Sequence, residues 1–335
     1  MKGSPMLGRC CILIALLILI ALLIAYKGIP SPAPESSRRI KIFLAGSLQI
    51  PLEEITGLYR KIKNLDFQME ASGSVEAIKK VTELGKYADL ILVADYNLIP
   101  KLMMNQTEWY VAFATDRLVI VYTESSKYAS EVNGTNWHQI LMREGVKVGI
   151  SDPNRDPCGY RSIISLLLAS NGSLASELLR GTNMRVRGME AWIPDPVQGS
   201  EKIVIRPKSV ELLALLESGA LDYAFEYESV AIQHNLSYLK LPEEIDLGNP
   251  ELKDLYSTAK VHLSSGVVIE GDVIAYGLTI PKVARNEGEA LEFTKFLLTE
   301  GLKIFEKLGQ RAIRPPLAYG EVPEELRGIV REVGG

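Results

Sequence analysis

The sequence predicts an α/β protein with two lobes and a cleft between them. Short apolar runs alternate with amphipathic segments of about ten to fifteen residues, a pattern typical of a sheet covered by helices. The alternation occurs in two successive series, and the segments near the C-terminus resemble those of the first series. We therefore expect the chain to cross between the lobes more than once.

The first series contains three strand–turn–helix units. In the first unit, the apolar run 40–44 leads through a short turn into a segment whose apolar residues recur at helical spacing. The next two units repeat this order, and a further apolar strand begins at Leu118. The three units cover residues 40–59, 67–84 and 88–103.

The second series predicts the other lobe. Its units, which again place an apolar strand before a helix, cover residues 146–170, 202–219 and 221–234. A last strand at 273–283 and an amphipathic helix at 289–308 return to the first lobe. The expected division is residues 39–124 and 270–335 for lobe I, and residues 125–269 for lobe II.

The N-terminal segment has the pattern of an export signal or a membrane anchor. Lys2 and Arg9 precede an uninterrupted apolar run from Cys10 to Ala25. Its 16 residues fall just short of the roughly 17 to 25 that span a membrane, so both alternatives stay open. Residues 28–38 are rich in Pro and Ser and predict an extended tether. We expect 1–27 to be signal or anchor, and the body to lie outside the cytoplasm.

The charge of the body limits its partners. The first 28 residues carry three basic and no acidic residues, so the rest of a chain with net charge −4 is acidic. An acidic exported body argues against nucleic acid as a partner. It also repels anions at long range, so an anionic ligand would have to be captured by local dipoles.

Two turns of the first series have the same physical design. Ala45-Gly46-Ser47 and Ser72-Gly73-Ser74 each join a strand to a helix, with the serine as a candidate N-cap. Helix N-termini of this kind bind anions without a cationic side chain. Either serine alone could merely cap its helix. Two such turns at the carboxyl edge of one sheet favour a shared ligand.

The second series contributes a rigid turn and two strand ends. Residues 151–161 contain two Asp-Pro pairs, and Asp156 is either a simple N-cap or a group that faces the cleft. Ser209 and Tyr227 follow strands, where structural roles are also common. Cys158 has no accompanying histidine motif and is an improbable nucleophile. The chain also lacks a phosphate-binding loop with lysine, GxSxG, HExxH and paired Cys/His spacing, so we expect a binding protein without a cofactor and not an enzyme.

Several of these runs together resemble a known family. AGSL, ADLILVADYNLIP, DPCGYRS and KIVIRPK are similar to segments of archaeal tungstate/molybdate-binding proteins of ABC transporters, and the similarity extends from about Ile40 to about Pro316. The resemblance implies a type II periplasmic-binding-protein fold whose lobes close on the anion. It also implies delivery of tungstate or molybdate to a membrane permease and its cytoplasmic ATPase. We expect the protein to be a monomer.

The resemblance also assigns site residues. It places oxyanion contacts on positions in both lobes, namely Gly46, Ser47, Ser74, Asp156, Pro157, Cys158 and Tyr227. In this family the metal of the oxyanion is thought to gain carboxylate oxygens, a role that falls on Asp156.

One position departs from the family pattern. The second carboxylate follows Arg-Pro-Lys in the family, and here that position is Ser209. Glu211 lies roughly 200° further around a helix and cannot replace it. Either Asp156 coordinates alone, or the anion stays tetrahedral and Ser209 donates a hydrogen bond. A different oxyanion such as sulfate or phosphate, and a tethered oxyanion sensor without a transport role, are the alternatives.

Overall fold

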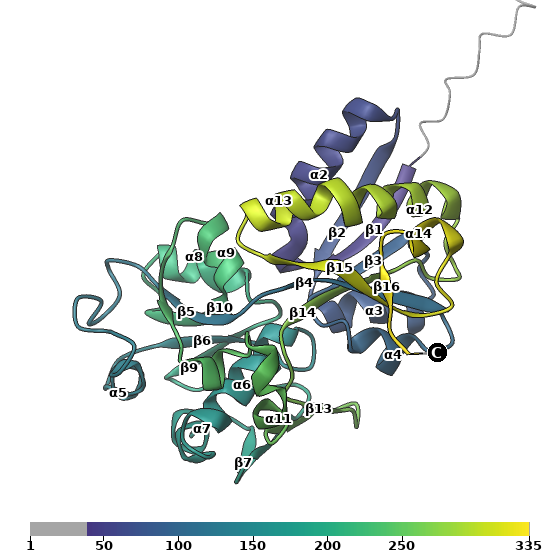
Figure 1. The fold of residues 1–335 in the computed structure, drawn as a ribbon. Helices are drawn as coiled ribbons and strands as arrows, with labels where there is room; N and C mark the ends of the chain where they lie inside the picture. Colours follow the sequence, from purple (N-terminus) through teal and green to yellow (C-terminus); the bar gives the residue numbers. More distant parts are fainter. Residues whose placement is uncertain (1–38, 335) are drawn as a thin grey trace, which may run out of the picture. The chain divides into compact units, whose positions relative to one another are not determined.

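Two mixed sheets organise residues 39–334, the part of the chain that the computed structural model describes (Figure 1). These residues belong to one compact unit. The predicted signal or anchor at 1–27 and the linker at 28–38 lie outside the described residues. Within 39–334, no helix is both long and apolar enough to cross a bilayer.

A seven-stranded sheet contains both ends of the described chain. Its strands, in spatial order, are β16 (Arg331–Glu332), β15 (Arg311–Gly320), β4 (Trp109–Thr115), β14 (Ala275–Thr279), β3 (Leu90–Val93), β1 (Arg39–Ala45) and β2 (Asp66–Ser72). β1 pairs in parallel with β2 and β3, whereas β14 is antiparallel to both of its neighbours. The carboxyl ends of β1, β2 and β3 therefore meet at one edge of this sheet.

Helices cover both faces of the seven-stranded sheet (Figure 1). One group consists of α2 (Gln49–Ile62), α12 (Glu287–Phe296), a π-helical turn (Leu297–Gly301) and α13 (Leu302–Lys307). The other consists of α3 (Ser74–Thr82) and α4 (Leu98–Met103), which pack on each other. The short α14 (Glu324–Arg327) packs on α12. The apolar faces of these helices are buried against the strands, as their spacing predicts.

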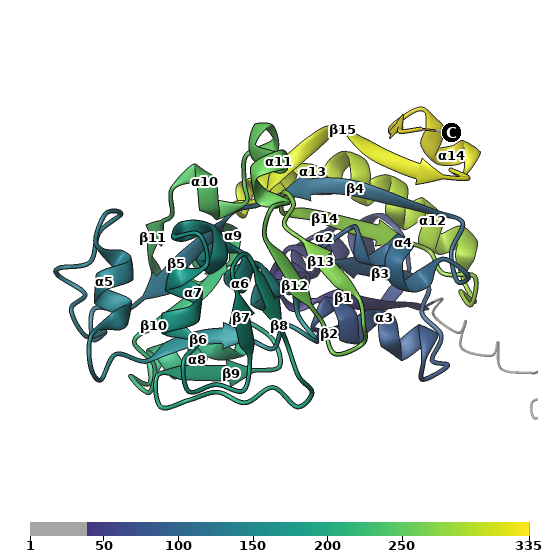
Figure 2. The same ribbon diagram turned by 90° about the horizontal axis from the view of Figure 1, so that it is seen from below.

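The second large sheet has five strands, and a separate sheet of four short strands accompanies it. Its order is β11 (Ser237–Lys240), β5 (Leu118–Tyr122), β10 (Tyr223–Tyr227), β6 (Val148–Ser151) and β9 (Ile203–Arg206). The four-stranded sheet β13 (Val268–Glu270), β12 (Lys260–His262), β8 (Glu190–Trp192), β7 (Arg185–Arg187) packs on α6 and α7 (Figure 2). The helices here are α5 (Trp137–Met142), α6 (Pro157–Ala169), α7 (Ser173–Leu178), α8 (Glu211–Glu217), α9 (Glu228–Gln233), α10 (Glu243–Asp246) and α11 (Lys253–Tyr256), with a 3₁₀ turn at Pro250–Leu252.

The chain passes between the two large sheets twice. The first crossing lies between β4, which ends at Thr115, and β5, which begins at Leu118 and pairs with β10. Residues 118–122 therefore belong to the five-stranded sheet, whereas the expected lobe I extended to 124. The return crossing lies between β13 and β14.

Candidate anion-binding site

Gly46 and Ser47 form a 3₁₀ turn, Gly46–Leu48, between β1 and α2. The side chain of Ser47 is buried, and its hydroxyl lies beside that of Tyr276 on β14. This hydroxyl has no hydrogen-bond partner of ordinary geometry within residues 39–334. A Cβ on Gly46 would lie 3.0 Å from a methyl group of Val210, so the first turn touches the segment that follows β9.

Ser74 is the first residue of α3. It is fully buried, and its Oγ accepts a hydrogen bond of 2.9 Å from the backbone N–H of Ala94. No acceptor for its own hydroxyl proton occurs among residues 39–334. The side chain is therefore fixed as a donor with an unused proton.

The prediction that Ser47 and Ser74 are N-caps is wrong. Ala45 and Gly73 occupy the N-cap positions, and no side chain caps either turn. Packing explains the glycine, because a Cβ on Gly73 would lie 2.3 Å from the carbonyl oxygen of Arg155. The N–H of Val75 donates to that same oxygen at 3.1 Å. The N-terminus of α3 is thus in main-chain contact with the turn before α6.

Asp156 is the N-cap residue of α6, as predicted, and Pro157 and Cys158 are its first two residues. The buried carboxylate of Asp156 does not cap its own helix. Its Oδ2 instead accepts a hydrogen bond of 2.8 Å from the N–H of Ser209. Burial raises the pKa of Asp156, and the bond from Ser209 opposes this rise.

Cys158 is the one cysteine among the described residues, and it is fully buried. Its Sγ lies 3.5 Å from the carbonyl oxygen of Phe225 on β10. Burial raises the pKa of the thiol well above its ordinary value, so the sulfur stays protonated and unreactive at neutral pH.

Ser209 and Tyr227 complete the predicted set. Ser209 does not begin a helix as expected, because α8 starts at Glu211 and Ser209 lies in the preceding turn. Tyr227 ends β10 and is the N-cap residue of α9, where the sequence predicted it. Its hydroxyl oxygen accepts a hydrogen bond of 2.8 Å from Nη1 of Arg161, and burial raises its pKa well above the ordinary value. The hydroxyl therefore keeps its proton, which has no acceptor within residues 39–334.

The predicted residues come together across the two sheets. Six of them are at most 5% exposed: Ser47, Ser74, Asp156, Cys158, Ser209 and Tyr227. Gly46 lies against Val210, the residue after Ser209, and Gly73 lies against Arg155 and Asp156. The N–H of Ser209 donates to Asp156. The result is a buried group of hydroxyl and backbone donors beside one carboxylate, with no lysine among its members.

Sequence reasoning missed two charged residues of this region. Arg161 is 3% exposed and contacts both sheets, as described below. Glu226 is fully buried: its Oε1 accepts from the N–H of Tyr227 at 2.8 Å, and its Oε2 lacks a partner within residues 39–334. Burial raises the pKa of Glu226 to about 8. Each is a lone charge in an otherwise apolar helix or strand, a signal that could have identified both.

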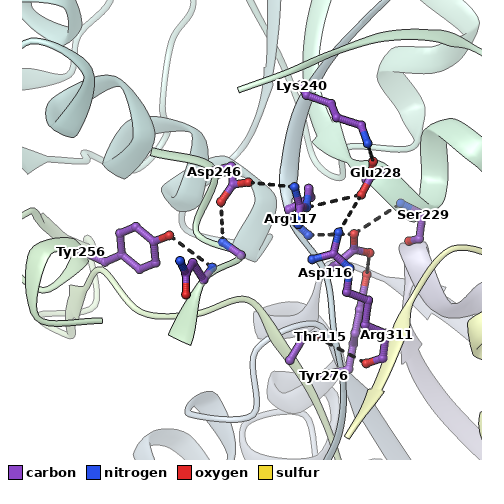
Figure 3. Close-up of polar contacts among 12 residues, drawn as sticks. Thr115, Asp116, Arg117, Glu228, Ser229, Lys240, Asp246, Tyr256, Tyr276 and Arg311 are labelled. Carbon is purple, nitrogen blue, oxygen red and sulfur yellow. Dashed lines mark hydrogen bonds and ion pairs between the residues drawn. The ribbon is translucent and has the colours of Figure 1, made fainter. Parts of the chain in front are cut away.

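A polar cluster lies at the first crossing between the sheets (Figure 3). Oδ2 of Asp116 accepts from the hydroxyl of Tyr276 at 2.9 Å, and Oδ1 accepts from the N–H groups of Arg117 at 2.8 Å and Ser229 at 3.3 Å. Burial raises the pKa of Asp116 to about 6. Because Tyr276 also borders Ser47, this cluster adjoins the candidate site.

Glu228 is the centre of the ion pairs in the same cluster (Figure 3). Its carboxylate lies 3.4 Å from Arg117, 3.4 Å from Arg311 and 3.1 Å from Lys240. Arg117 also lies 3.5 Å from Asp246. These pairs join the crossing to β11, to β15 and to α10. Within 39–334, no group of three or more His, Cys, Asp or Glu side chains is placed to hold a metal ion.

Comparison with a family model gives the class of protein to which the chain belongs. Residues 40–311 match the family described as bacterial extracellular solute-binding protein, and the chain belongs to this family, whose members are binding proteins and not enzymes.

Two archaeal relatives narrow the comparison. The chain is 46% identical over 312 residues to the molybdate/tungstate-binding protein WtpA of Pyrococcus abyssi, covering 88% of this chain and 91% of that protein. It is 45% identical over 312 residues to WtpA of Thermococcus kodakarensis, covering 88% of each chain. The resemblance predicted from the sequence is confirmed.

Solved structures agree in fold. The periplasmic molybdate-binding protein of Azotobacter vinelandii aligns with a TM-score of 0.58 at 16% identity, over 81% of this chain and 98% of that one. The sulfate-binding protein SubI of Mycobacterium tuberculosis H37Rv aligns with a TM-score of 0.59 at 13% identity, over 83% and 88%. The described residues therefore have the type II periplasmic-binding-protein fold, with two mixed sheets.

Proposed function

We propose that this protein captures molybdate or tungstate outside the cytoplasm and delivers the anion to an ABC-type permease and its ATPase. The names of the two WtpA relatives support the choice of anion. The observation that carries the proposal is the pair of buried hydroxyl groups of Ser74 and Tyr227, whose protons have no acceptor within 39–334. A dianion between them supplies that acceptor.

The anion is held mainly by neutral donors. Ser47 and Ser74 lie at the carboxyl edge of the first sheet, where the N-terminus of the nine-residue α3 adds a positive dipole end. Backbone N–H groups of Gly46 and Cys158 and the hydroxyl of Tyr227 complete the shell. Hydrogen bonds to a charged acceptor in a site without water are strong, and they offset the long-range repulsion from the acidic body.

Asp156 is the carboxylate of the site. Its Oδ2 accepts a hydrogen bond from the N–H of Ser209, and the proposal assigns its other oxygen, Oδ1, to the metal of the oxyanion. With Ser209 in place of a second carboxylate, the metal gains at most one carboxylate ligand from these two positions. X-ray absorption of the tungstate complex tests this, and a six-coordinate signal with two carboxylates would contradict it.

The two sheets with their helices act as two lobes. We place the lobe boundaries at residues 116–117 and 271–274, where the chain crosses. The open protein binds the anion on lobe I through Ser47 and Ser74, and lobe II then closes the cleft over it. Residues 1–27 hold the body at the membrane or direct its export, and 28–38 are the tether.

Calorimetric titration tests the proposed function. The body, residues 39–335, is titrated with molybdate, tungstate, sulfate and phosphate. We expect tight binding of molybdate and tungstate, and weak or no binding of sulfate and phosphate. Preferential binding of sulfate or phosphate would support the alternative oxyanion, and no binding of any of the four would refute the proposal.

A further inference from the structure

Two adjacent residues of α6 contact the segment that follows β3. Tyr160 and Arg161 are the fourth and fifth residues of α6, which packs on the five-stranded sheet. Ala94 and Asp95 follow β3 of the seven-stranded sheet. All four residues are buried. The contact therefore lies at a junction between the two sheets, at the edge that also carries the candidate anion site.

The contact consists of short, charge-assisted hydrogen bonds. The hydroxyl of Tyr160 donates to Oδ2 of Asp95 at 2.6 Å, and Nη1 of Arg161 donates to the carbonyl oxygen of Ala94 at 2.7 Å. Nη2 of Arg161 lies 3.6 Å from Oδ1 of Asp95. Asp95 is held in place by its own turn, because its Oδ1 accepts from the N–H of Asn97 at 3.0 Å.

The same groups hold the two donors assigned to the anion. The carbonyl oxygen of Ala94 accepts a hydrogen bond from Arg161, and the N–H of Ala94 donates a hydrogen bond to the hydroxyl oxygen of Ser74. Arg161 also donates to the hydroxyl oxygen of Tyr227, so the proton of Tyr227 must point elsewhere. Ser74 at the start of α3 and Tyr227 at the end of β10 are thus connected through Arg161 and the backbone N–H and C=O of one residue, Ala94.

We propose that Tyr160 and Arg161 form a latch with Ala94 and Asp95 that keeps the protein closed on its bound anion and orients the hydroxyl of Tyr227 toward it. The inference rests on the proposed function. Separating the sheets breaks every latch bond, so the latch contributes only to the closed form. A group that stabilises only the closed form slows anion release and leaves the encounter with the open form unchanged.

The charge of Arg161 strengthens this coupling. Burying a guanidinium is costly unless acceptors and a counter-charge accompany it. In the closed protein it has the carbonyl of Ala94, the hydroxyl of Tyr227 and the nearby carboxylate of Asp95. A dianion beside Tyr227 adds further negative charge close to the guanidinium. Closure is therefore most favourable when the anion is present.

Release kinetics test the latch. The full chain is loaded with radiolabelled molybdate, and its loss is followed after a chase of excess unlabelled molybdate. We expect Tyr160→Phe, which removes one hydroxyl, to release the label roughly tenfold or more faster, the usual effect of losing a hydrogen bond to a charged group. Arg161→Met should release faster still, and Arg161→Lys, which keeps the charge but not the fork, should lie between Arg161→Met and wild type.

The matched control is Tyr223→Phe. The hydroxyl of Tyr223 donates to the carbonyl oxygen of Lys127, also at 2.6 Å, and this bond does not link the two sheets. Its removal should leave the release rate unchanged. The melting temperature of the anion-free protein should be the same for Tyr160→Phe and wild type, whereas the rise in melting temperature on adding molybdate should be smaller in the variant.

The outcomes separate the two proposals. If wild type binds molybdate and Tyr160→Phe releases it at the wild-type rate, the latch is refuted and the proposed function stands. A fall in the anion-free melting temperature equal to the loss in the loaded protein would also refute the latch, since the bond would then exist without the anion. If wild type binds none of the four oxyanions, both proposals are refuted.

Discussion

Single hydroxyl groups carry most of the proposed recognition. Ser47 and Ser74 differ in how they are held: Ser74 is fixed by the N–H of Ala94, whereas Ser47 has no hydrogen bond of ordinary geometry within 39–334. A buried donor without a protein acceptor is uncommon, because an unmet polar group costs free energy. A bound oxyanion would supply the acceptor that both hydroxyl groups lack.

Replacing either serine by alanine should weaken molybdate binding. We expect Ser47→Ala and Ser74→Ala each to lose about 1 to 3 kcal/mol of binding free energy, measured by calorimetric titration, because a buried charged acceptor is left short of a donor. Ser165→Ala is the control, since Ser165 is equally buried and unpartnered but lies further along α6. Unchanged affinity in both variants would place the anion elsewhere.

The carboxyl group of Glu226 should make binding depend on pH. Burial raises its pKa to about 8, so it is mostly neutral at pH 7 and ionised above pH 8. An ionised carboxylate near the site repels a dianion, so affinity should fall as the pH rises through about 8. Titrations between about pH 7 and about pH 9 should show this fall in wild type and not in Glu226→Gln. Equal slopes for the two proteins would exclude Glu226 as the titrating group.

Sequence reasoning reached those site residues that lie where strands end. The candidates Ser47, Ser74 and Tyr227 could be proposed because each follows the carboxyl end of a strand, Ser47 and Ser74 in the seven-stranded sheet and Tyr227 in the five-stranded sheet. Arg161 was not found as a partner of Ala94, because its acceptor is a backbone oxygen 67 positions away in the chain. Side-chain patterns contain no information about such an oxygen.

At the scale of elements, the start of α3 is in main-chain contact with the turn before α6. Gly73 has an ordinary negative φ of −63°, so its backbone conformation does not require glycine. The contact with Arg155 does, because any side chain would collide with the carbonyl oxygen. The glycine here is a packing requirement at the closed interface.

Gly73→Ala should therefore hinder closure with little effect on folding of the separate lobes. We expect weaker molybdate binding, measured by calorimetry, and a nearly unchanged melting temperature without the anion. Gly57→Ala is the matched control, because a Cβ at Gly57 in α2 meets nothing within 4 Å. Full affinity in Gly73→Ala would show that the α3 contact is not part of the bound state.

Some elements were hidden from sequence analysis for physical reasons. β15 contains Pro315 and Pro316, which normally argue against a strand, and its pairing with β4 shifts register between Ala312 and Leu317 to accommodate them. The strands of the four-stranded sheet have three residues each, too few to show a period. Longer apolar strands such as β1 and β10 were predicted correctly.

At the scale of the whole molecule, Asp116 connects the crossing to both sheets. Its carboxylate accepts hydrogen bonds from the hydroxyl of Tyr276 in the seven-stranded sheet and from the N–H of Ser229 in the helix after β10. Burial raises the pKa of Asp116 to about 6. Its ionised form is therefore costly in the folded protein.

This cost should appear as a pH-dependent loss of stability. Because the folded-state pKa of Asp116 is above the ordinary 3.8, its contribution is most favourable below about pH 4 and is lost as the pH rises through about 6. Denaturant unfolding at about pH 4.5 and about pH 7.5 should show Asp116→Asn gaining stability over wild type, by an amount on the order of 2 kcal/mol between the two pH values. A constant difference between the two proteins would exclude this titration.

The main-chain bond from Val75 to Arg155 has a further consequence for unloading. If the proposed function is right, backbone atoms close the site over the anion. Because this hydrogen bond joins two backbone groups, a change of side chain at Val75 or Arg155 does not remove its donor or its acceptor. To receive the anion, the permease must then break this hydrogen bond between peptide groups of the two lobes. ATP hydrolysis by the transporter would supply the free energy. The surface around the contact between α3 and the turn before α6 would also differ between the open and the closed protein. A permease that binds this surface could therefore distinguish the loaded protein without contacting the anion.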